Sequence, residues 1–406
     1  MNKALNFILA SRWRQAAAGI VAGSLLSALL VACGGGGDST SAAGGNATPL
    51  SFASGPIGGL GSIIVGGVRF DDSTARIEDD DDGSVHQARE LKLGMMVEVQ
   101  AGAIDDSSAR ATASLIRFGS ELTGAVQSID SLASTLRLLD QTIEIKSTTV
   151  FEDGLAGLAA VTVGQILEVH ALFDATSGHY VATRVESEVA ANAFRLRGVI
   201  SALDTTAKTF KINDAVINYA SVPAGSLPAV DLANGQRVRV RLQTTQVNGQ
   251  WVALTVRNGV RRVDDIGDAR IRGLVTSFTS PQRFDVQGVA VDASAAVFEP
   301  NAAAVHLGAI VDVRGRVANG GIVATRVRVR DGNDDDIKRV ELHGDVSGLD
   351  TANTSFMLRD VKVNYSRVLE WKNGSAADLA NGKRLEVKGL WSEDRRVLLA
   401  VVIEFE

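Results

Sequence analysis

The chain has 406 residues, of which 45% are hydrophobic and 22% charged, and its formal net charge is −6. One compact core is not expected at this length, so the composition predicts a globular chain of several domains. The acidic balance does not suit phosphate-backbone binding, which needs clustered cations, so we expect no nucleic-acid partner.

Residues 1–32 have the pattern of a secretory signal peptide. Lys3, Arg12 and Arg14 give a basic start, and residues 16–32 follow as an apolar run rich in Ala, Leu and Val. The run is too short and ends too abruptly to be a comfortable membrane span. Removing residues 1–32 takes away three basic and no acidic residues, which leaves a net charge of about −9.

Cys33 is the single cysteine of the chain and directly follows this run. The tetrad Leu30-Val31-Ala32-Cys33 resembles the lipobox of bacterial lipoproteins, which implies that the Cys33 thiol carries a lipid. The alternative is a cysteine inside an ordinary signal peptide or a core. The resemblance further implies the outer membrane, because Gly34 rather than Asp follows the cysteine. We expect the body to face the periplasm or the cell surface, with the membrane as a partner through Cys33.

Residues 33–54 are predicted to be a tether. The stretch 34–48 consists almost entirely of Gly, Ser, Ala and Thr, which cannot bury enough surface to fold. Because no second cysteine follows, the exported chain has no internal disulfide and must rely on its apolar core.

The body repeats one unit about every 72 residues. A first landmark is an apolar strand interrupted by glycine, as in Leu196-Arg197-Gly198-Val199-Ile200. A second landmark is a glycine before another strong strand, and it recurs at Gly94, Gly164, Gly235, Gly308 and Gly382. Two landmarks with one period indicate tandem small domains, each with its own core.

Within each unit the apolar residues alternate, as in residues 237–242, which predicts half-buried strands. Five strands with a longer connection between the third and fourth favour a small OB-like β-barrel over a sandwich. We expect an all-β array of five barrels. The predicted boundaries are 55–118, 119–190, 191–260, 261–333 and 334–406.

The first unit opens with residues 61–71, Gly-Ser-Ile-Ile-Val-Gly-Gly-Val-Arg-Phe-Asp. This stretch resembles a bacterial family known as domain of unknown function number 5666, found in secreted and lipid-anchored proteins. Endings such as Val181-Ala182-Thr183-Arg184-Val185 extend the likeness over most of residues 55–406. Because the family has no assigned activity, the resemblance implies a barrel fold and transfers no catalytic residue.

No catalytic constellation is recognisable, so we expect no enzyme activity and no cofactor. His170 and His179 flank a predicted hairpin, but no third ligand lies near them in the sequence. The acidic runs 78–83 and 331–336 are the remaining metal candidates. They offer Asp79, Asp81, Asp334 and Asp336 to a weakly bound calcium ion, and a solvated charged loop is the alternative.

Aromatic side chains mark where a ligand would bind. OB-like barrels often use aromatic platforms for sugars or oligonucleotides, and the third and fifth units carry most of the large rings. The candidates are Tyr219, Trp251, Tyr365, Trp371 and Trp391, with packing in the core as the alternative.

The sequence predicts a non-enzymatic, lipid-anchored envelope protein with a binding or structural role. An envelope glycan or protein is its candidate partner. The alternatives are a periplasmic carbohydrate-binding module and an enzyme whose site is assembled between repeats.

Overall fold

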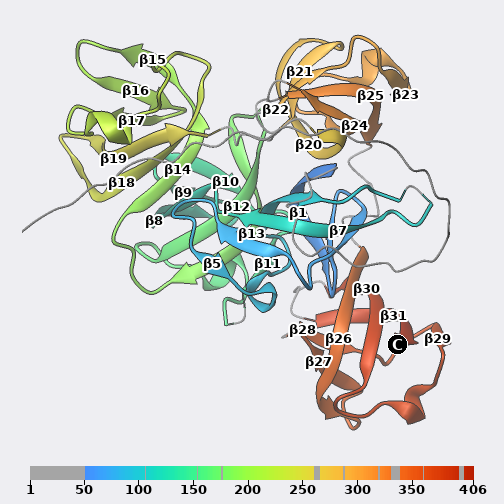
Figure 1. The fold of residues 1–406 in the computed structure, drawn as a ribbon. Coiled ribbons are helices and arrows are strands. Elements are labelled where there is room, and N and C mark those ends of the chain that lie inside the picture. Colours follow the sequence, from blue (N-terminus) through green and yellow to red (C-terminus); the bar gives the residue numbers. More distant parts are fainter. Residues whose placement is uncertain are drawn as a thin grey trace, which may run out of the picture. The chain divides into compact units, whose positions relative to one another are not determined.

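The computed structural model describes residues 51–105, 107–152, 154–174, 177–259, 266–286, 289–318, 321–330, 339–359, 361–392 and 397–406. They form five tandem β-barrels, numbered 1 to 5 here and coloured from blue to red in Figure 1. The predicted all-β fold and five-fold repetition are therefore confirmed. Cys33, Asp334 and Asp336 lie outside the described residues.

The strands of the five barrels have the following bounds. Barrel 1 contains β1 (Ser51–Leu60), β2 (Ile63–Val65), β3 (Val68–Asp71), β4 (Arg76–Asp79), β5 (Val85–His86), β6 (Met96–Ala101) and β7 (Arg110–Phe118). Barrel 2 contains β8 (Leu122–Asp130), β9 (Thr135–Leu138), β10 (Gln141–Glu144), β11 (Val150–Phe151), β12 (Ile166–Asp174) and β13 (His179–Glu188). Barrel 3 contains β14 (Phe194–Val199), β15 (Ser201–Asp204), β16 (Thr209–Ile212), β17 (Ala215–Asn218), β18 (Arg237–Val247) and β19 (Gln250–Asn258). Barrel 4 contains β20 (Ile266–Ser280), β21 (Arg283–Val286), β22 (Val289–Asp292), β23 (Val297–Glu299), β24 (Ile310–Ala318) and β25 (Gly321–Arg330). Barrel 5 contains β26 (Arg339–Asp350), β27 (Ser355–Leu358), β28 (Val361–Asn364), β29 (Glu370–Lys372), β30 (Arg384–Trp391) and β31 (Val397–Phe405).

Every barrel closes in the same way. In barrel 2, β8 pairs with β9 and β12, β9 pairs with β10, and β12 pairs with β13, all antiparallel. The barrel closes through a parallel pair between β10 and β13. The equivalent parallel pair joins β3 to β7, β17 to β19, β22 to β25 and β28 to β31. Closure removes the open edges that would invite aggregation, so the sandwich alternative is wrong.

The connection before each fourth strand contains a short 3₁₀ helix and then a glycine turn. The helices are η1 (Ala88–Glu90), η2 (Leu158–Ala160), η3 (Ala224–Ser226), η4 (Ala302–Ala304) and η6 (Ala376–Asp378). The turn glycines have φ between 79° and 87°, a left-handed conformation that favours glycine. The amide of Gly164, for example, donates to the carbonyl of Val126 at 2.8 Å. The recurring glycine of the sequence therefore fixes where strand four meets strand one. These glycines are Gly94, Gly164, Gly235, Gly308 and Gly382.

A β-bulge recurs in the fourth strand of every barrel. In barrel 2 the pairing of β12 with β13 shifts register between His170 and Ala171. The same shift follows Gln100, Arg241, Arg314 and Lys388 in the other barrels. Bulges bend a strand and re-aim its side chains, which places one polar residue per barrel at the bend.

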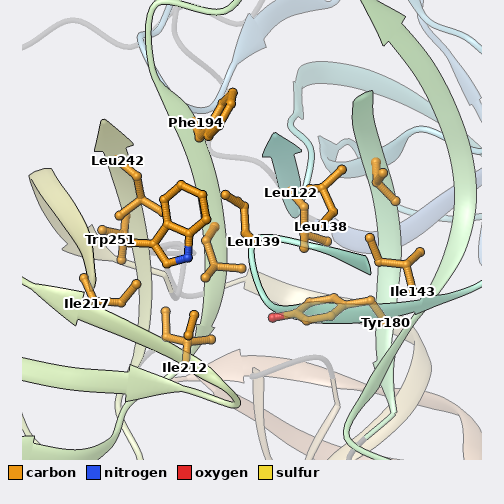
Figure 2. Close-up of a cluster of buried hydrophobic side chains, with 14 of the residues drawn as sticks. Leu122, Leu138, Leu139, Ile143, Tyr180, Phe194, Ile212, Ile217, Leu242 and Trp251 are labelled. Atoms are coloured by element: carbon orange, nitrogen blue, oxygen red, sulfur yellow. The ribbon is translucent and has the colours of Figure 1, made fainter. Parts of the chain in front are cut away.

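Apolar side chains fill the barrels. Figure 2 shows the cluster to which both barrels 2 and 3 contribute, including Leu138 and Tyr180 from barrel 2 and Ile212 from barrel 3. The Tyr180 hydroxyl is fully buried and donates to the carbonyl of Arg197 at 2.5 Å. Burial raises the pKa of this hydroxyl, so it stays protonated as a donor. Among the described residues, no helix has the length and hydropathy needed to cross a membrane.

Candidate functional site

Each barrel places a charged residue on its outer face in the middle of the fourth strand. The position is Glu98, Glu168, Arg239, Asp312 or Glu386, and its two neighbours in sequence are buried valine or leucine residues. Because side chains alternate along a strand, these charges point outward while their neighbours fill the barrel. The fold therefore repeats one outer position, which carries a carboxylate in four barrels and an arginine in barrel 3.

In barrel 5 this outer face holds Glu341, His343 and Glu386. The imidazole Nε2 of His343 lies 3.2 Å from Glu341 Oε1 and 3.8 Å from Glu386 Oε1. Its Nδ1 lies 2.5 Å from Glu406 Oε1, and the Lys388 ammonium lies 2.8 Å from Glu386. Burial lowers the pKa of His343, although the Glu406 carboxylate opposes it. Both ring nitrogens of His343 are therefore occupied, within an ion-pair network.

In barrel 2 the outer face holds Glu168, His170 and Glu186. Glu168 on β12 stands directly opposite Glu186 on β13, and His170 follows Glu168 on the same side of β12. His170 Nε2 lies 3.8 Å from Glu168 Oε1 and 3.8 Å from Glu186 Oε2. These distances are too long for hydrogen bonds, and Nε2 has no hydrogen-bond partner among the described residues. The imidazole is fully buried, and each carboxylate side chain keeps 18% of its surface exposed.

The other ring nitrogen of His170 meets the backbone of barrel 1 and the connection that follows it. Nδ1 lies 3.2 Å from the carbonyl oxygen of Gly119 and 3.2 Å from the amide nitrogen of Met96. It donates to the carbonyl in one tautomer and accepts from the amide in the other. Burial disfavours the imidazolium, but the carboxylates of Glu186 and Glu168 outweigh burial and raise the pKa of His170.

Arg184 holds one oxygen of the Glu186 carboxylate. Its Nη2 lies 2.7 Å from Glu186 Oε1, so the second oxygen, Oε2, is the one that faces His170. Burial works against the charged form of Glu186, yet His170 and Arg184 lower its pKa to about 2. The carboxylate is therefore ionised at every physiological pH.

The two clusters share a short sequence pattern. Glu168-Val169-His170 and Glu341-Leu342-His343 share the pattern Glu-apolar-His, which places a carboxylate and an imidazole on one face of a strand. The third members, Glu186 and Glu386, come from neighbouring strands and depend on register. His170 and His179, which flank the predicted hairpin, do not meet: His179 stands opposite Asp174, four residues beyond His170 on β12, and lies 2.9 Å from Glu144.

The first acidic run contacts arginines. Asp81 is 5% exposed, and its carboxylate lies 3.3 Å from Arg195 Nε and 3.6 Å from Arg239 Nε. Asp80 lies 2.7 Å from Arg239 and also pairs with Arg197. Asp79 accepts the amide of Asp81 at 2.6 Å, and burial raises the pKa of Asp79. Guanidinium groups therefore supply the positive charge beside Asp80 and Asp81.

Tyr219 and Trp251 lie in the wall of barrel 3. Both are buried, with Tyr219 tilted against Phe210 at a centroid distance of 5.7 Å and Trp251 edge-on to Phe194 at 6.1 Å. The Trp251 indole N–H donates to Asp140 of barrel 2 at 2.8 Å. These two rings pack against their own domain and its neighbour, as the core alternative predicts.

Tyr365 and Trp371 belong to an aromatic row in barrel 5. Tyr365 lies 6.2 Å from Trp371, which stacks on Phe405 at 6.3 Å, and all three rings are partly exposed. Trp391 ends β30, and its side chain lies outside the described part of the chain. The aromatic row of barrel 5, Tyr365, Trp371 and Phe405, is thus the more accessible of the two aromatic candidates.

The comparisons with known proteins agree with the repeated fold. A family described as "Domain of unknown function (DUF5666)" matches residues 54–113, 123–186, 197–257, 272–328 and 343–404. The chain belongs to this family. The five DUF5666 matches fall on the five barrels, and together they cover more than half of the chain.

Other comparisons add little to the DUF5666 assignment. No curated protein matches the sequence. A solved structure titled Drosophila Unr CSD456 is similar at 12% identity, over 52% of this chain and 97% of that one, with a TM-score of 0.15. A TM-score this low supports no argument about fold or function.

Proposed function

We propose that this chain is a lipid-anchored protein of the outer membrane that binds envelope components through the outer faces of its barrels and catalyses no reaction. The observation that carries the proposal is the repetition of one closed barrel with a filled interior and a charged residue at the same place on its outer face. Repeated modules on one chain gain avidity from several weak contacts.

Anchoring rests on the sequence around Cys33. Acyl chains on that cysteine and a tether of small residues place the barrels near the membrane without a spanning segment. The acidic body disfavours nucleic acid and leaves an envelope glycan or protein as the partner.

The test compares the wild-type chain with Cys33→Ser in cells. We expect the wild type to need detergent for release from the outer-membrane fraction, and the variant to leave the membrane in buffer alone. Cross-linking in intact cells then compares envelope partners between the two. Equal membrane retention of Cys33→Ser would contradict anchoring, and cross-linking patterns no different from an unrelated periplasmic protein would contradict the binding role.

Carbohydrate binding is the second candidate, and the aromatic row of barrel 5 favours it. Partly exposed rings such as Tyr365 and Trp371 can stack on sugar faces. A glycan array probed with the wild type and with Trp371→Ala tests it. Loss of a specific signal in the variant supports the candidate, and no glycan signal from the wild type excludes it.

A further inference from the structure

The outer face of barrel 2 carries a cluster of two carboxylates and an imidazole, in which one ring nitrogen has no hydrogen bond among the described residues. The nitrogen and carboxylate oxygens of Glu168, His170 and Glu186 all lie within 4.8 Å of one another. His170 Nε2 is buried, faces both carboxylates, and makes no hydrogen bond among the described residues. A buried polar atom without a hydrogen bond is costly, so a native structure that keeps one calls for an explanation.

We propose that Glu168, His170 and Glu186 form a binding site for a divalent transition metal ion, with Zn²⁺ as the ion that the donors fit best. Zinc takes imidazole nitrogen and carboxylate oxygen at about 2.0–2.2 Å, with three protein ligands and water completing the shell. Two such ligands at a tetrahedral angle lie roughly 3.4 Å apart, close to the 3.8 Å separations in the cluster. Calcium prefers six to eight oxygen ligands and fits this donor set less well.

The surroundings suit a metal ligand set. When His170 Nδ1–H donates to the Gly119 carbonyl, the Nε2 lone pair points to the carboxylates. A backbone carbonyl is a typical partner for the second ring nitrogen of a metal-binding histidine, and metal binding selects this tautomer over the one that accepts from the Met96 amide. Arg184 orients Glu186 in the same manner and leaves Oε2 directed at His170. Binding displaces any proton on Nε2 into solvent and replaces it with the ion.

The other barrels show why the site is confined to barrel 2 among the described residues. The position before the bulge is Gln100, Arg241, Arg314 or Lys388 elsewhere, and none of these side chains is a usual zinc ligand. The cluster of barrel 5, Glu341, His343 and Glu386, has the same composition, but the Arg69 guanidinium contacts both Glu341 and His343 Nε2, and Glu406 contacts Nδ1. That cluster is the natural control.

The full chain is purified in detergent, stripped of metal with a chelator and loaded again with Zn²⁺. The test then measures the zinc that stays bound. We expect one equivalent of tightly held Zn²⁺, a rise in melting temperature, and d–d absorption bands when Co²⁺ replaces zinc. His170→Gln and Glu168→Gln should weaken binding at least about 100-fold, because each removes a direct ligand. His343→Gln in barrel 5 should bind zinc as the wild type does.

Glu168→Gln keeps the test decisive if His170→Gln fails to fold, because Glu168 is partly exposed and its amide has a similar shape. Circular dichroism establishes that each variant is folded. Wild-type protein that retains no zinc after dialysis would overturn the proposal and leave His170 as an imidazolium between two carboxylates. Binding that survives in folded Glu168→Gln, or that is lost in His343→Gln, would overturn it as well. The role proposed for Cys33 is unaffected by either result.

Discussion

Asp140 joins barrel 2 to barrel 3 through two hydrogen bonds and makes a third within barrel 2. It lies in the turn between β9 and β10 with φ of 59°. Its Oδ2 accepts from the Trp251 indole at 2.8 Å and from the Gln246 amide at 2.9 Å, and its Oδ1 accepts from Gln127 at 2.8 Å. Asp140→Gly removes all three bonds without the strain that alanine would add at positive φ.

The expected cost follows from the kind of bond lost. A hydrogen bond to a charged group contributes about 1.5–3 kcal/mol, and partial exposure of Asp140 places the loss near the lower end. With a urea m-value of about 2 kcal/mol/M, a loss of about 1.5 kcal/mol lowers the unfolding midpoint by about 0.7 M. Trp251 should also emit at longer wavelength as its N–H becomes hydrated.

The assay is urea unfolding followed by Trp251 emission. A parent protein carrying Trp13→Phe, Trp371→Phe and Trp391→Phe leaves Trp251 as the single tryptophan. Asp140→Asn is the matched control, because it keeps an acceptor oxygen and tolerates positive φ, and it should shift the midpoint less than half as far. A midpoint for Asp140→Gly within about 0.2 M of the parent, with unchanged emission, would refute the reasoning.

Two further predictions concern barrels 3 and 4. Gly198→Ala should lower the stability of barrel 3 by about 1–3 kcal/mol in urea unfolding, because its new methyl group would lie 2.3 Å from Ile212 Cγ2. Gly225→Ala, with open space around it, should change little, and equal midpoints for the two variants would count against this packing. In barrel 4, burial of Asp312 opposes its charge, but hydrogen bonds from Arg270 at 3.0 and 2.6 Å help to lower the pKa of Asp312. Because this pKa is lower in the folded state, the ionised carboxylate stabilises the folded protein at pH values above the unfolded-state pKa of about 3.9. That stabilisation is lost as the pH falls through the folded-state pKa. The gap in melting temperature between wild type and Asp312→Asn should therefore narrow below about pH 4, and a constant gap down to pH 2.5 would disprove the linkage.

The sequence predicted the parts of the fold that local chemistry determines. Gly164 and Gly235 recur because the turn before strand four needs positive φ, so their period exposed the repeat. Alternation in residues 237–242 predicted a strand because its valines fill the barrel while its arginines point outward. Each signal depends only on a few consecutive residues of the chain.

The candidate site depends on contacts between residues that are far apart in the sequence. Glu186 reaches His170 only through the register of β12 and β13, and the bulge after His170 changes that register. Asp80 contacts Arg239 of another barrel, which no local pattern reveals. The indole N–H of Trp251 likewise finds its acceptor in Asp140, more than 100 residues away. Sequence patterns therefore located rings and charges without showing which of them face one another.

The most direct test of the whole account is the mass of the mature N-terminal peptide of the protein isolated from membranes. We predict a chain that begins at Cys33, carries a diacylglycerol-sized addition and additional acyl mass on that residue, and loses both in Cys33→Ser. An unmodified Cys33, or a chain that still contains residues 1–32, would contradict a lipid-anchored array of barrels.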